Sequence, residues 1–310
     1  MRPKLIVIIG PTAAGKSARA MALAPTLEAG AEIISADSRH IYRRMDIGAN
    51  KPTPQDRSIV PHHLIDLREP HESFSLGEYV RLARAAIADV RARGKVPLLV
   101  GGAGQYVRAL LEGWRVPAAP PRPDIRRRWE AFVALRGQDA LRRELEARDP
   151  AALATIDARN IRRVIRALEV MEITGERWSD LQRREPPDLR DVEIVYVNLP
   201  RPALYARADA RLIAMIEQGW LDETRALLDY LSAQGIDADA ALRLPAMSAL
   251  GYRQMIAVAR GRMTLEEAIA AIQRDTRRFI RAQDTWFRAI VASAAAQGAR
   301  VVHEPAAPLS

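Results

Sequence analysis

The chain has 310 residues, of which 48% are hydrophobic and 27% are charged, which is typical of a globular protein that can bury a full core. It contains no cysteine, which excludes disulfides, iron–sulfur clusters and cysteine-ligated zinc. The formal net charge of +9 suits a polyanionic partner, although genome composition can produce the same arginine excess. No apolar run reaches the roughly 18 residues of a membrane span, and the N-terminus has the pattern of a strand, not of a signal peptide. We expect a cytoplasmic protein with no membrane partner.

Near the N-terminus the chain carries a complete phosphate-loop motif, G-x-x-x-x-G-K-[ST], at Gly10, Pro11, Thr12, Ala13, Ala14, Gly15, Lys16 and Ser17. An apolar run, Leu5–Ile9, precedes it and good helix formers follow it, which is the strand–loop–helix setting that the motif requires. Backbone N–H groups and the helix N-terminus of such a loop surround phosphate oxygens. We predict that these residues bind phosphate groups, with Lys16 neutralising oxygens and Ser17 helping to hold Mg²⁺.

A second strand pattern, Glu32–Asp37, ends in an acid. Ligands of parallel α/β sheets bind at the carboxyl ends of strands, so Asp37 is expected beside the phosphate loop. The apolar strand Lys95–Val100 ends in Gly101 and Gly102, where an ATPase would carry an acid for Mg²⁺. The phosphate loop alone suggests ATP, but this arrangement favours a transferase with Asp37 as its base.

Two proline-rich segments, Val116–Pro123 and Arg184–Asp188, flank a region with helical patterns only. We therefore predict an α/β fold: a P-loop core (1–122 and 189–310) with a parallel sheet flanked by helices, and a helical insertion domain (123–188). Inside the insertion, arginines recur at i, i+3, i+4 and i+7, opposite an apolar face: Arg159, Arg162, Arg163 and Arg166. A solvated face normally mixes charges, so we predict that this arginine face contacts phosphates of a nucleic-acid backbone.

The rest of the chain returns to the core. Glu193–Leu199 alternates like a strand of the sheet, and a helix carrying Arg207 and Arg211 follows. A capping box at Thr264–Glu267 begins the last long helix, whose arginines have the same spacing as those of the insertion: Arg274, Arg277, Arg278 and Arg281. The weakly patterned tail from Ser293 is expected to fray.

Together these stretches resemble the tRNA dimethylallyltransferases, also called tRNA isopentenyltransferases. The resemblance runs through nearly the whole chain and includes Gly10–Ser17, Asp37-Ser38, Met45–Gly48, Lys51-Pro52, Pro61–Asp66, Gly101-Gly102, Arg166–Val170, Gly251–Arg253, Gln283 and Thr285–Arg288. A phosphate loop is common to many activities, whereas this ordered set is specific to the family.

The resemblance implies that the phosphate loop holds the diphosphate of dimethylallyl diphosphate, with Mg²⁺, in place of a nucleoside triphosphate. The dimethylallyl group would pass to N6 of the adenine immediately 3′ of the anticodon, in tRNAs that read codons beginning with U, with release of diphosphate. Asp37 would be the general base and Arg211 a diphosphate ligand, with Arg207 on the same helix face as the alternative.

The helical insertion would bind the anticodon stem of the tRNA, and we expect a monomer. The residues that the resemblance implies for tRNA binding are Asp37, Ser38, Arg39, His40, Ala103, Arg126, Arg162, Arg163, Arg166, Gly251, Tyr252, Arg253, Arg281 and Trp286. Three positions depart from the family pattern. Ala103 stands where threonine is usual, His40 where glutamine is usual, and Ala49-Asn50 where a Thr-Ala pair is usual. We expect retained activity with altered substrate contacts.

Three alternatives remain at this point. An adenylate isopentenyltransferase, acting on AMP, ADP or ATP, would not need an arginine-rich insertion. A P-loop small-molecule kinase leaves that insertion and the Trp286 helix unexplained. A non-enzymatic RNA-binding protein would explain the charge, but not an acid beside an intact phosphate loop.

Overall fold

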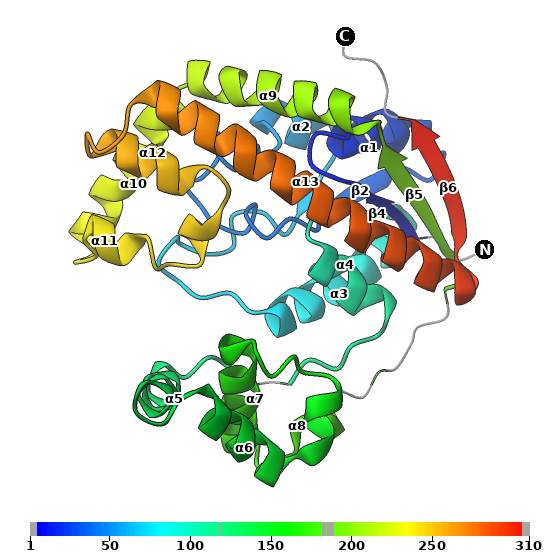
Figure 1. The fold of residues 1–310 in the computed structure, drawn as a ribbon. Helices are drawn as coiled ribbons and strands as arrows, with labels where there is room; N and C mark the ends of the chain where they lie inside the picture. Colours follow the sequence, from blue (N-terminus) through cyan, green and yellow to red (C-terminus); the bar gives the residue numbers. More distant parts are fainter. Residues whose placement is uncertain (1–4, 118, 182–183, 185–188, 306–310) are drawn as a thin grey trace. The chain divides into compact units, whose positions relative to one another are not determined.

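The computed structural model describes residues 5–117, 119–181, 184 and 189–305 (Figure 1). The chain divides into two compact units. The first unit contains residues 1–74, 81–111 and 188–310, and the second contains residues 75–80 and 112–187. Apart from residues 75–80, the second unit begins at Glu112, which precedes the insertion boundary at 123 that the sequence suggested. The second proline-rich segment, 184–188, lies outside the described residues except for Arg184.

A six-stranded sheet in the order β3-β2-β4-β1-β5-β6 forms the centre of the first unit, and its neighbouring strands pair in parallel. The strands are β1 Leu5–Ile9, β2 Ala31–Ser35, β3 His62–His63, β4 Val96–Gly101, β5 Val192–Asn198 and β6 Arg300–Pro305. The expected α/β fold with a parallel sheet is therefore confirmed, and β5 is the strand expected after the insertion.

Both faces of the sheet are covered, which explains the continuous apolar run of β1. Ile6 and Ile8 belong to a core cluster with Ala20, Ala208 and Ile280, which lie on three different helices. The alternate residues of β1, Val7 and Ile9, are also fully buried. A strand buried on both faces can be apolar at every position, as parallel strands between layers of helices usually are.

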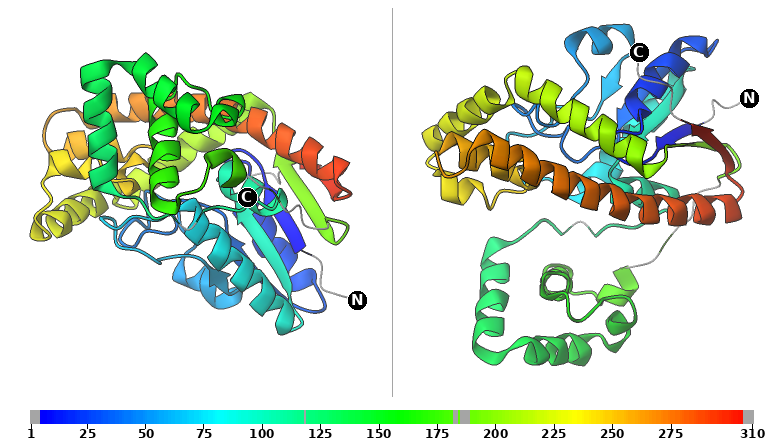
Figure 2. Two further views of the ribbon diagram at one scale, coloured as in Figure 1. Left: turned by 90° about the horizontal axis from the view of Figure 1, so that it is seen from below. Right: turned by 45° about the horizontal axis from the view of Figure 1, so that its top comes forward.

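The long helices α9 and α13 lie side by side in the first unit (Figures 1 and 2). α13 begins at the predicted capping box, in which Thr264 accepts a hydrogen bond from the Glu267 backbone. The helices of this unit are α1 Lys16–Leu23, η1 Ala24–Thr26, α2 Pro54–Ile59, α3 Leu76–Ala92 (which the unit boundary crosses), α4 Gly104–Leu111, α9 Arg201–Glu217, α10 Trp220–Ala233, α11 Ala238–Ala241, η3 Ala246–Ser248, α12 Tyr252–Ala259 and α13 Leu265–Ala296. None of the helices in the described part of the chain is long and apolar enough to cross a membrane.

The expectation that the chain frays from Ser293 is wrong. α13 continues to Ala296, and β6 then pairs with β5 from Glu193–Arg300 to Asn198–Pro305. The Glu304 side chain also pairs with Arg19, on the helix that follows the phosphate loop. The sequence pattern of this strand is weak because it lies at the edge of the sheet, where its residues are only partly buried.

The regular elements of the second unit, among its described residues, are helices: α5 Pro123–Arg136, α6 Gln138–Arg148, η2 Pro150–Ala154, α7 Ile161–Thr174 and α8 Trp178–Leu181. Its core is separate from that of the sheet and contains Trp129, Leu141, Leu145, Val164 and Leu168. The side chain of Asn160 caps the start of α7, and Gly175 ends it in a left-handed conformation, with φ of 72°.

Candidate active site

A cavity of about 470 Å³ lies in the first unit, at the carboxyl ends of the strands. It brings together Lys16 and Ser17 of the phosphate loop, Asp37 after β2, and Arg211 of α9. The sequence placed the first three at one edge of the sheet and left two candidates on α9 for the diphosphate ligand. Of these two, Arg211 is the one that lines the cavity.

Glycines let the phosphate loop lie close to neighbouring strands. A Cβ atom at Gly10 would come within 2.0 Å of the Val197 carbonyl oxygen on β5. Gly15, at the start of α1, has a φ of 88°, which favours glycine. Lys16 folds back so that its Nζ donates to the carbonyl of Pro11, at 2.9 Å. The loop thus has a fixed backbone around the place where phosphate would bind.

Gln283, on α13, connects the phosphate loop to the end of β4. Its Oε1 accepts a hydrogen bond from the Thr12 backbone N–H at 2.8 Å, and its Nε2 donates to the Gly102 carbonyl at 3.1 Å. The side chain is buried, and it lines the cavity. Sequence reasoning assigned no role to Gln283, because its partner Thr12 lies 271 residues away and no local pattern marks the contact.

The first of the two glycines at the end of β4, Gly101, is required by the chain that follows the neighbouring strand β2. A Cβ atom at Gly101 would lie 2.1 Å from the carbonyl oxygen of Ala36, and Ala103 N–H donates to that same oxygen at 3.0 Å. No side chain fits between the ends of β2 and β4. The absence of an acid at this position therefore has a steric cause, and Asp37 is the carboxylate presented at this edge.

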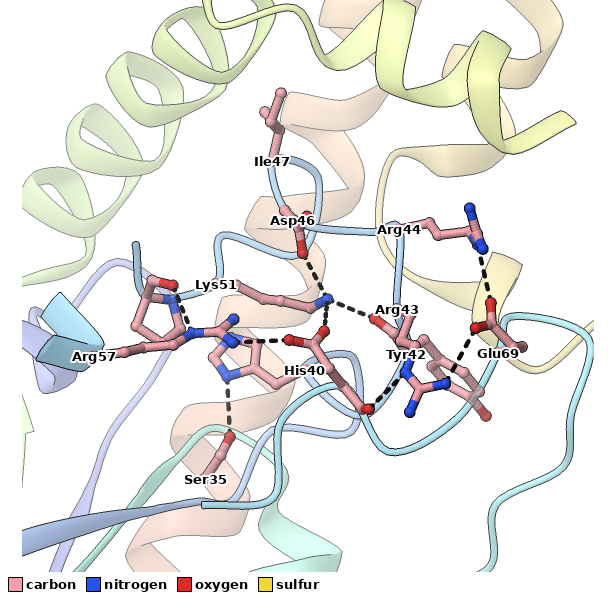
Figure 3. A network of polar contacts seen from close by, with 12 residues as sticks. Ser35, His40, Tyr42, Arg43, Arg44, Asp46, Ile47, Lys51, Arg57 and Glu69 are labelled. Atoms are coloured by element: carbon pink, nitrogen blue, oxygen red, sulfur yellow. Dashed lines mark hydrogen bonds and ion pairs between the residues drawn. The ribbon is translucent and has the colours of Figure 1, made fainter. Parts of the chain in front are cut away.

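Asp37 is held by a turn of its own backbone. Its Oδ1 accepts a hydrogen bond from the Arg39 N–H at 2.8 Å, and the Ser35 hydroxyl lies 3.0 Å from Nδ1 of His40 (Figure 3). Burial lowers the pKa of His40, although nearby Asp37 opposes the shift. The imidazole is therefore neutral at physiological pH and can hydrogen-bond without adding a charge.

The charges in the cavity favour an anionic ligand. Burial lowers the pKa of Lys16 to about 8, with a further lowering from Arg211 and an opposing effect of Asp37. Burial also lowers the pKa of Arg211, and Asp37 again opposes the shift. Because burial disfavours the charged forms of both cations, a phosphate that enters the cavity gives each of them a strong partner. The single carboxylate beside them is placed to accept a proton.

One wall of the cavity is largely apolar. Ala208, Leu212 and Met215 line it from α9, and Ile272 and Phe279 line it from α13. A small molecule with an anionic head and an apolar tail would match these two parts. Three large apolar side chains that line the cavity are also open to solvent, namely Leu250, Phe279 and Trp286. Exposed aromatic rings are the usual stacking surfaces for unpaired bases.

The sequence assigned Mg²⁺ to Ser17, and the structure fits this assignment. Ser17 is exposed and lines the cavity together with Asp37. Among the described residues, no group of three histidine, aspartate or glutamate side chains could hold a metal ion by itself. Magnesium bound with phosphates takes most of its ligands from phosphate oxygens and water. One hydroxyl beside a phosphate loop is therefore a suitable protein ligand.

The family model described as IPP transferase matches residues 40–290. The chain belongs to this family. Among curated relatives of the family, the tRNA dimethylallyltransferase of Roseiflexus sp. (strain RS-1) is 52% identical over 284 residues, which cover 92% of this chain and 90% of that protein. The tRNA dimethylallyltransferase of Thermomicrobium roseum is 46% identical over 287 residues, covering 93% and 84%.

Solved structures of IPP transferases have the same fold. The tRNA isopentenylpyrophosphate transferase of Bacillus halodurans aligns with a TM-score of 0.64 and 35% identity, covering 99% of this chain and 91% of that chain. A eukaryotic dimethylallyltransferase acting on tRNA aligns with a TM-score of 0.82 over 97% of this chain and 74% of that one. At 24% identity, the second likeness shows the fold alone.

The proposed RNA-binding residues of this IPP transferase occupy different environments in the first unit. Ser38, Arg39, His40 and Ala103 line the cavity, as Trp286 does. Arg253 and Arg281 are exposed on α12 and α13. Gly251 and Tyr252 are buried, and the Tyr252 hydroxyl donates to Glu223. Tyr252 is therefore not placed to contact RNA with its side chain, contrary to the expectation from the sequence.

The expected arginine stripe of the second unit is interrupted. Arg159 precedes α7 and pairs with Asp157, so it is not part of the helix. Arg166 pairs with Glu169, a fully buried acid that also binds Arg126. A negative charge therefore does lie beside these arginines. The arginine spacing did not indicate it, because Glu169 lies on the inner side of α7.

Arg162 and Arg163 remain exposed on α7 and form no ion pair with any side chain that the structure describes. They are the members of the stripe that are open to a phosphate backbone. Arg126 and Arg166, which pair with the buried acid Glu169, have side chains that are 40% and 27% exposed. These two can still meet a phosphate while they hold Glu169.

Proposed function

We propose that this protein is a tRNA dimethylallyltransferase. It transfers the dimethylallyl group of dimethylallyl diphosphate to N6 of the adenine immediately 3′ of the anticodon, in tRNAs that read codons beginning with U. The observation that carries the proposal is the cavity itself, where a phosphate loop, two cations and one free carboxylate meet an apolar wall. The curated relatives are named for this activity, which favours tRNA over free adenylate as the acceptor.

The donor would lie with its diphosphate in the phosphate loop and its five-carbon group against α9 and α13. Lys16, Arg211 and the backbone N–H groups of the loop face the oxygens that gain charge as the C–O bond breaks. Because these groups are fixed in advance, they stabilise the leaving diphosphate more than the intact donor. Magnesium, when bound at Ser17 and the diphosphate, would add positive charge at the same place.

Asp37 would act as the general base. The new bond forms between N6 of adenine and the allylic carbon, while the bond from that carbon to the diphosphate oxygen breaks. The amine must lose one proton, and a carboxylate within hydrogen-bond reach accepts it. Since Oδ1 of Asp37 already accepts the Arg39 N–H, Oδ2 is the oxygen available for this proton.

The helical unit would bind the stem of the RNA, with Arg162 and Arg163 as contacts to backbone phosphates. The base to be modified must leave its stack to reach the cavity, which costs a few kcal/mol and less in an unpaired loop. Exposed Trp286 at the cavity offers a ring on which a displaced base or its neighbour can stack.

A single assay tests the function. The protein is incubated with Mg²⁺, dimethylallyl diphosphate and unmodified tRNA, and in parallel with AMP in place of tRNA. Mass analysis of the digested nucleosides should find one added dimethylallyl group on adenosine from tRNA, and no product from AMP. Product from AMP alone would instead support adenylate isopentenyltransferase activity, and transfer of phosphate from ATP would support a kinase.

A further inference from the structure

Glu223, on α10, binds a loop that lines the cavity. Its Oε2 accepts hydrogen bonds from the backbone N–H groups of Asp46 and Ile47, both at 2.6 Å, and its Oε1 accepts one from Gly48 at 3.0 Å. The Tyr252 hydroxyl donates to Oε1 at 2.7 Å. Successive N–H groups around an anion form a nest. One carboxylate thus fixes the backbone of three consecutive residues.

The packing around this carboxylate leaves no free space. A Cβ atom at Gly48 would come within 2.0 Å of Nε1 of Trp220 and 2.5 Å of the Tyr252 hydroxyl. A Cβ atom at Gly251 would lie 2.2 Å from the Trp220 ring. The rings of Trp220 and Tyr252 meet edge to face at 5.5 Å, and both are buried. The loop therefore lies directly against α10 and α12.

A second anchor holds the other end of the loop. The side chain of Lys51 is only 1% exposed, and its Nζ donates to the Tyr42 carbonyl at 2.6 Å and to the Asp46 carboxylate at 2.8 Å (Figure 3). It also pairs with Asp66 at 2.6 Å. Residues 46–51, which we call the acceptor loop, are thus fixed at both ends, and Ala49 lies between the anchors.

The acceptor loop forms a polar part of the cavity wall. Gly48, Ala49 and Asn50 line the cavity, as do Ser38 and His40 of the turn that follows Asp37. These segments offer backbone groups, a side-chain amide and the Ser38 hydroxyl, whereas the apolar wall comes from α9 and α13. Base edges are recognised by hydrogen-bonding groups of this kind, and a dimethylallyl group is not. Glu223 itself does not line the cavity.

We propose that Glu223 is a positioning residue for the RNA acceptor: it holds the acceptor loop so that Gly48, Ala49 and Asn50 can contact the base that is modified. The inference rests on the proposed function. Glu223 should affect the RNA and not the donor, because the phosphate loop and Arg211 would bind the diphosphate of the donor. Glu223 contacts neither of them. Loss of Glu223 should therefore weaken the use of RNA and spare the use of the donor.

The test compares the variants Glu223→Ala and Glu223→Gln with Asp229→Asn. Asp229 is exposed on the same helix and pairs with no described side chain, so its variant removes one charge without touching the loop. For each protein, the KM of an anticodon stem-loop RNA and the KM of dimethylallyl diphosphate are measured separately. RNA binding is also titrated without donor, and the folded fraction is measured by thermal melting.

Glu223→Ala should raise the KM for RNA about 10-fold to 100-fold, the effect expected of a misplaced binding group, and leave the KM for the donor within about twofold. Glu223→Gln keeps one oxygen acceptor and should have an intermediate effect. Asp229→Asn should match the parent protein. The RNA titration should follow the same order.

A fall in folded fraction with both KM values unchanged would overturn the proposal, because Glu223 would then only support the fold. An equal rise in both KM values would also overturn it. If Glu223→Ala does not fold, the KM values of Glu223→Gln for RNA and for the donor test the proposal in its place. If the parent protein modifies no RNA, the proposed function fails, and the RNA titration still shows whether Glu223 positions the loop for RNA.

Discussion

At the scale of single residues, the cavity combines groups whose environments set their chemistry. Burial and the nearby Arg211 lower the pKa of Lys16, burial lowers the pKa of Arg211, and Asp37 opposes both shifts. The residues can therefore respond strongly to an incoming diphosphate. Because the cations and the carboxylate have distinct tasks in the proposed reaction, their loss should affect different kinetic constants.

Replacement of Asp37 by asparagine should lower turnover by roughly 10²-fold to 10⁴-fold, because an amide cannot accept the proton of the adenine amine. The amide oxygen can still accept the Arg39 N–H, so the turn is expected to persist. Single-turnover rates with saturating RNA measure the chemical step, and RNA binding should be nearly unchanged. Turnover close to that of the parent protein would exclude Asp37 as the base.

The pKa of about 8 for Lys16 predicts a pH dependence of donor binding. Lys16 carries its charge below this pKa and loses it as pH rises through about 8, so kcat/KM for dimethylallyl diphosphate should fall above pH 8. Arginine keeps its charge throughout this range. The kcat/KM of Lys16→Arg is compared with its own value at pH 7, and its profile should show no such fall. The same fall in both proteins would assign the titration to another group.

Gln283 should contribute to the shape of the phosphate loop. Gln283→Leu removes the hydrogen bonds to the partly buried Thr12 N–H and the Gly102 carbonyl, and a lost hydrogen bond typically costs about 1 kcal/mol. We expect a KM for the donor that is about 10-fold higher. Gln297→Leu, an exposed glutamine change at the end of the same helix, serves as the control. An unaltered donor KM in Gln283→Leu would contradict the role.

At the scale of elements, α7 shows how one helix can both pack and bind. Its inner face carries Val164, Leu168 and the buried acid Glu169, and its outer face carries Arg162 and Arg163. The single negative charge of Glu169 offsets part of the positive charge of Arg166 on α7 and Arg126 on α5. The two free arginines are the ones whose removal should change electrostatic binding most directly.

Arg162→Gln with Arg163→Gln should reduce the slope of log K for tRNA against log salt by about 1.4–1.8, since each phosphate contact releases close to one counterion. The matched control is Arg225→Gln with Arg300→Gln, which removes the same charge from two exposed residues that pair with acids of their own. Affinity is measured from low to physiological salt. An equal change of slope in both double variants would reflect net charge and not contact.

At the scale of the whole molecule, stability and function depend on different ends of the sheet. The cavity lies where the strands end, whereas Glu32 lies at the start of β2, with Lys95 before β4. Burial by itself would raise the pKa of Glu32, but hydrogen bonds from Lys95, Arg93 and His63 outweigh it and lower the pKa to about 2. This network joins β2, β3 and the end of α3.

A fall of the Glu32 pKa from 4.5 to about 2 corresponds to roughly 3 kcal/mol of folding stability at neutral pH. Because the folded-state pKa is the lower one, this stability is present above about pH 5 and lost as pH falls toward 2. Urea unfolding at pH 7, 5 and 3 should show a steep loss in the parent protein. Glu32→Gln should be less stable at pH 7 and lose less on acidification, while Glu130→Gln, an exposed control, should follow the parent.

The sequence determined the parts of this protein that depend on local geometry. A phosphate-loop motif between an apolar run and a helical segment indicates a strand–loop–helix unit. An acid at the end of the next strand then lies at the same edge of a parallel sheet. Lys16, Ser17 and Asp37 therefore line one cavity, as the sequence suggested, and the ordered motifs were enough to indicate the family.

Only the tertiary structure decided contacts between distant segments. Gln283 reaches a loop 271 residues away, and Glu223 binds an amide 175 residues away, so neither contact leaves a local pattern. Edge strand β6 gave a weak sequence pattern because its residues are only partly buried, and its pairing with the distant strand β5 decides its conformation. The pairing of the arginines depends on Glu169, which is buried on the inner face of α7. The helical spacing of the sequence could not reveal that burial.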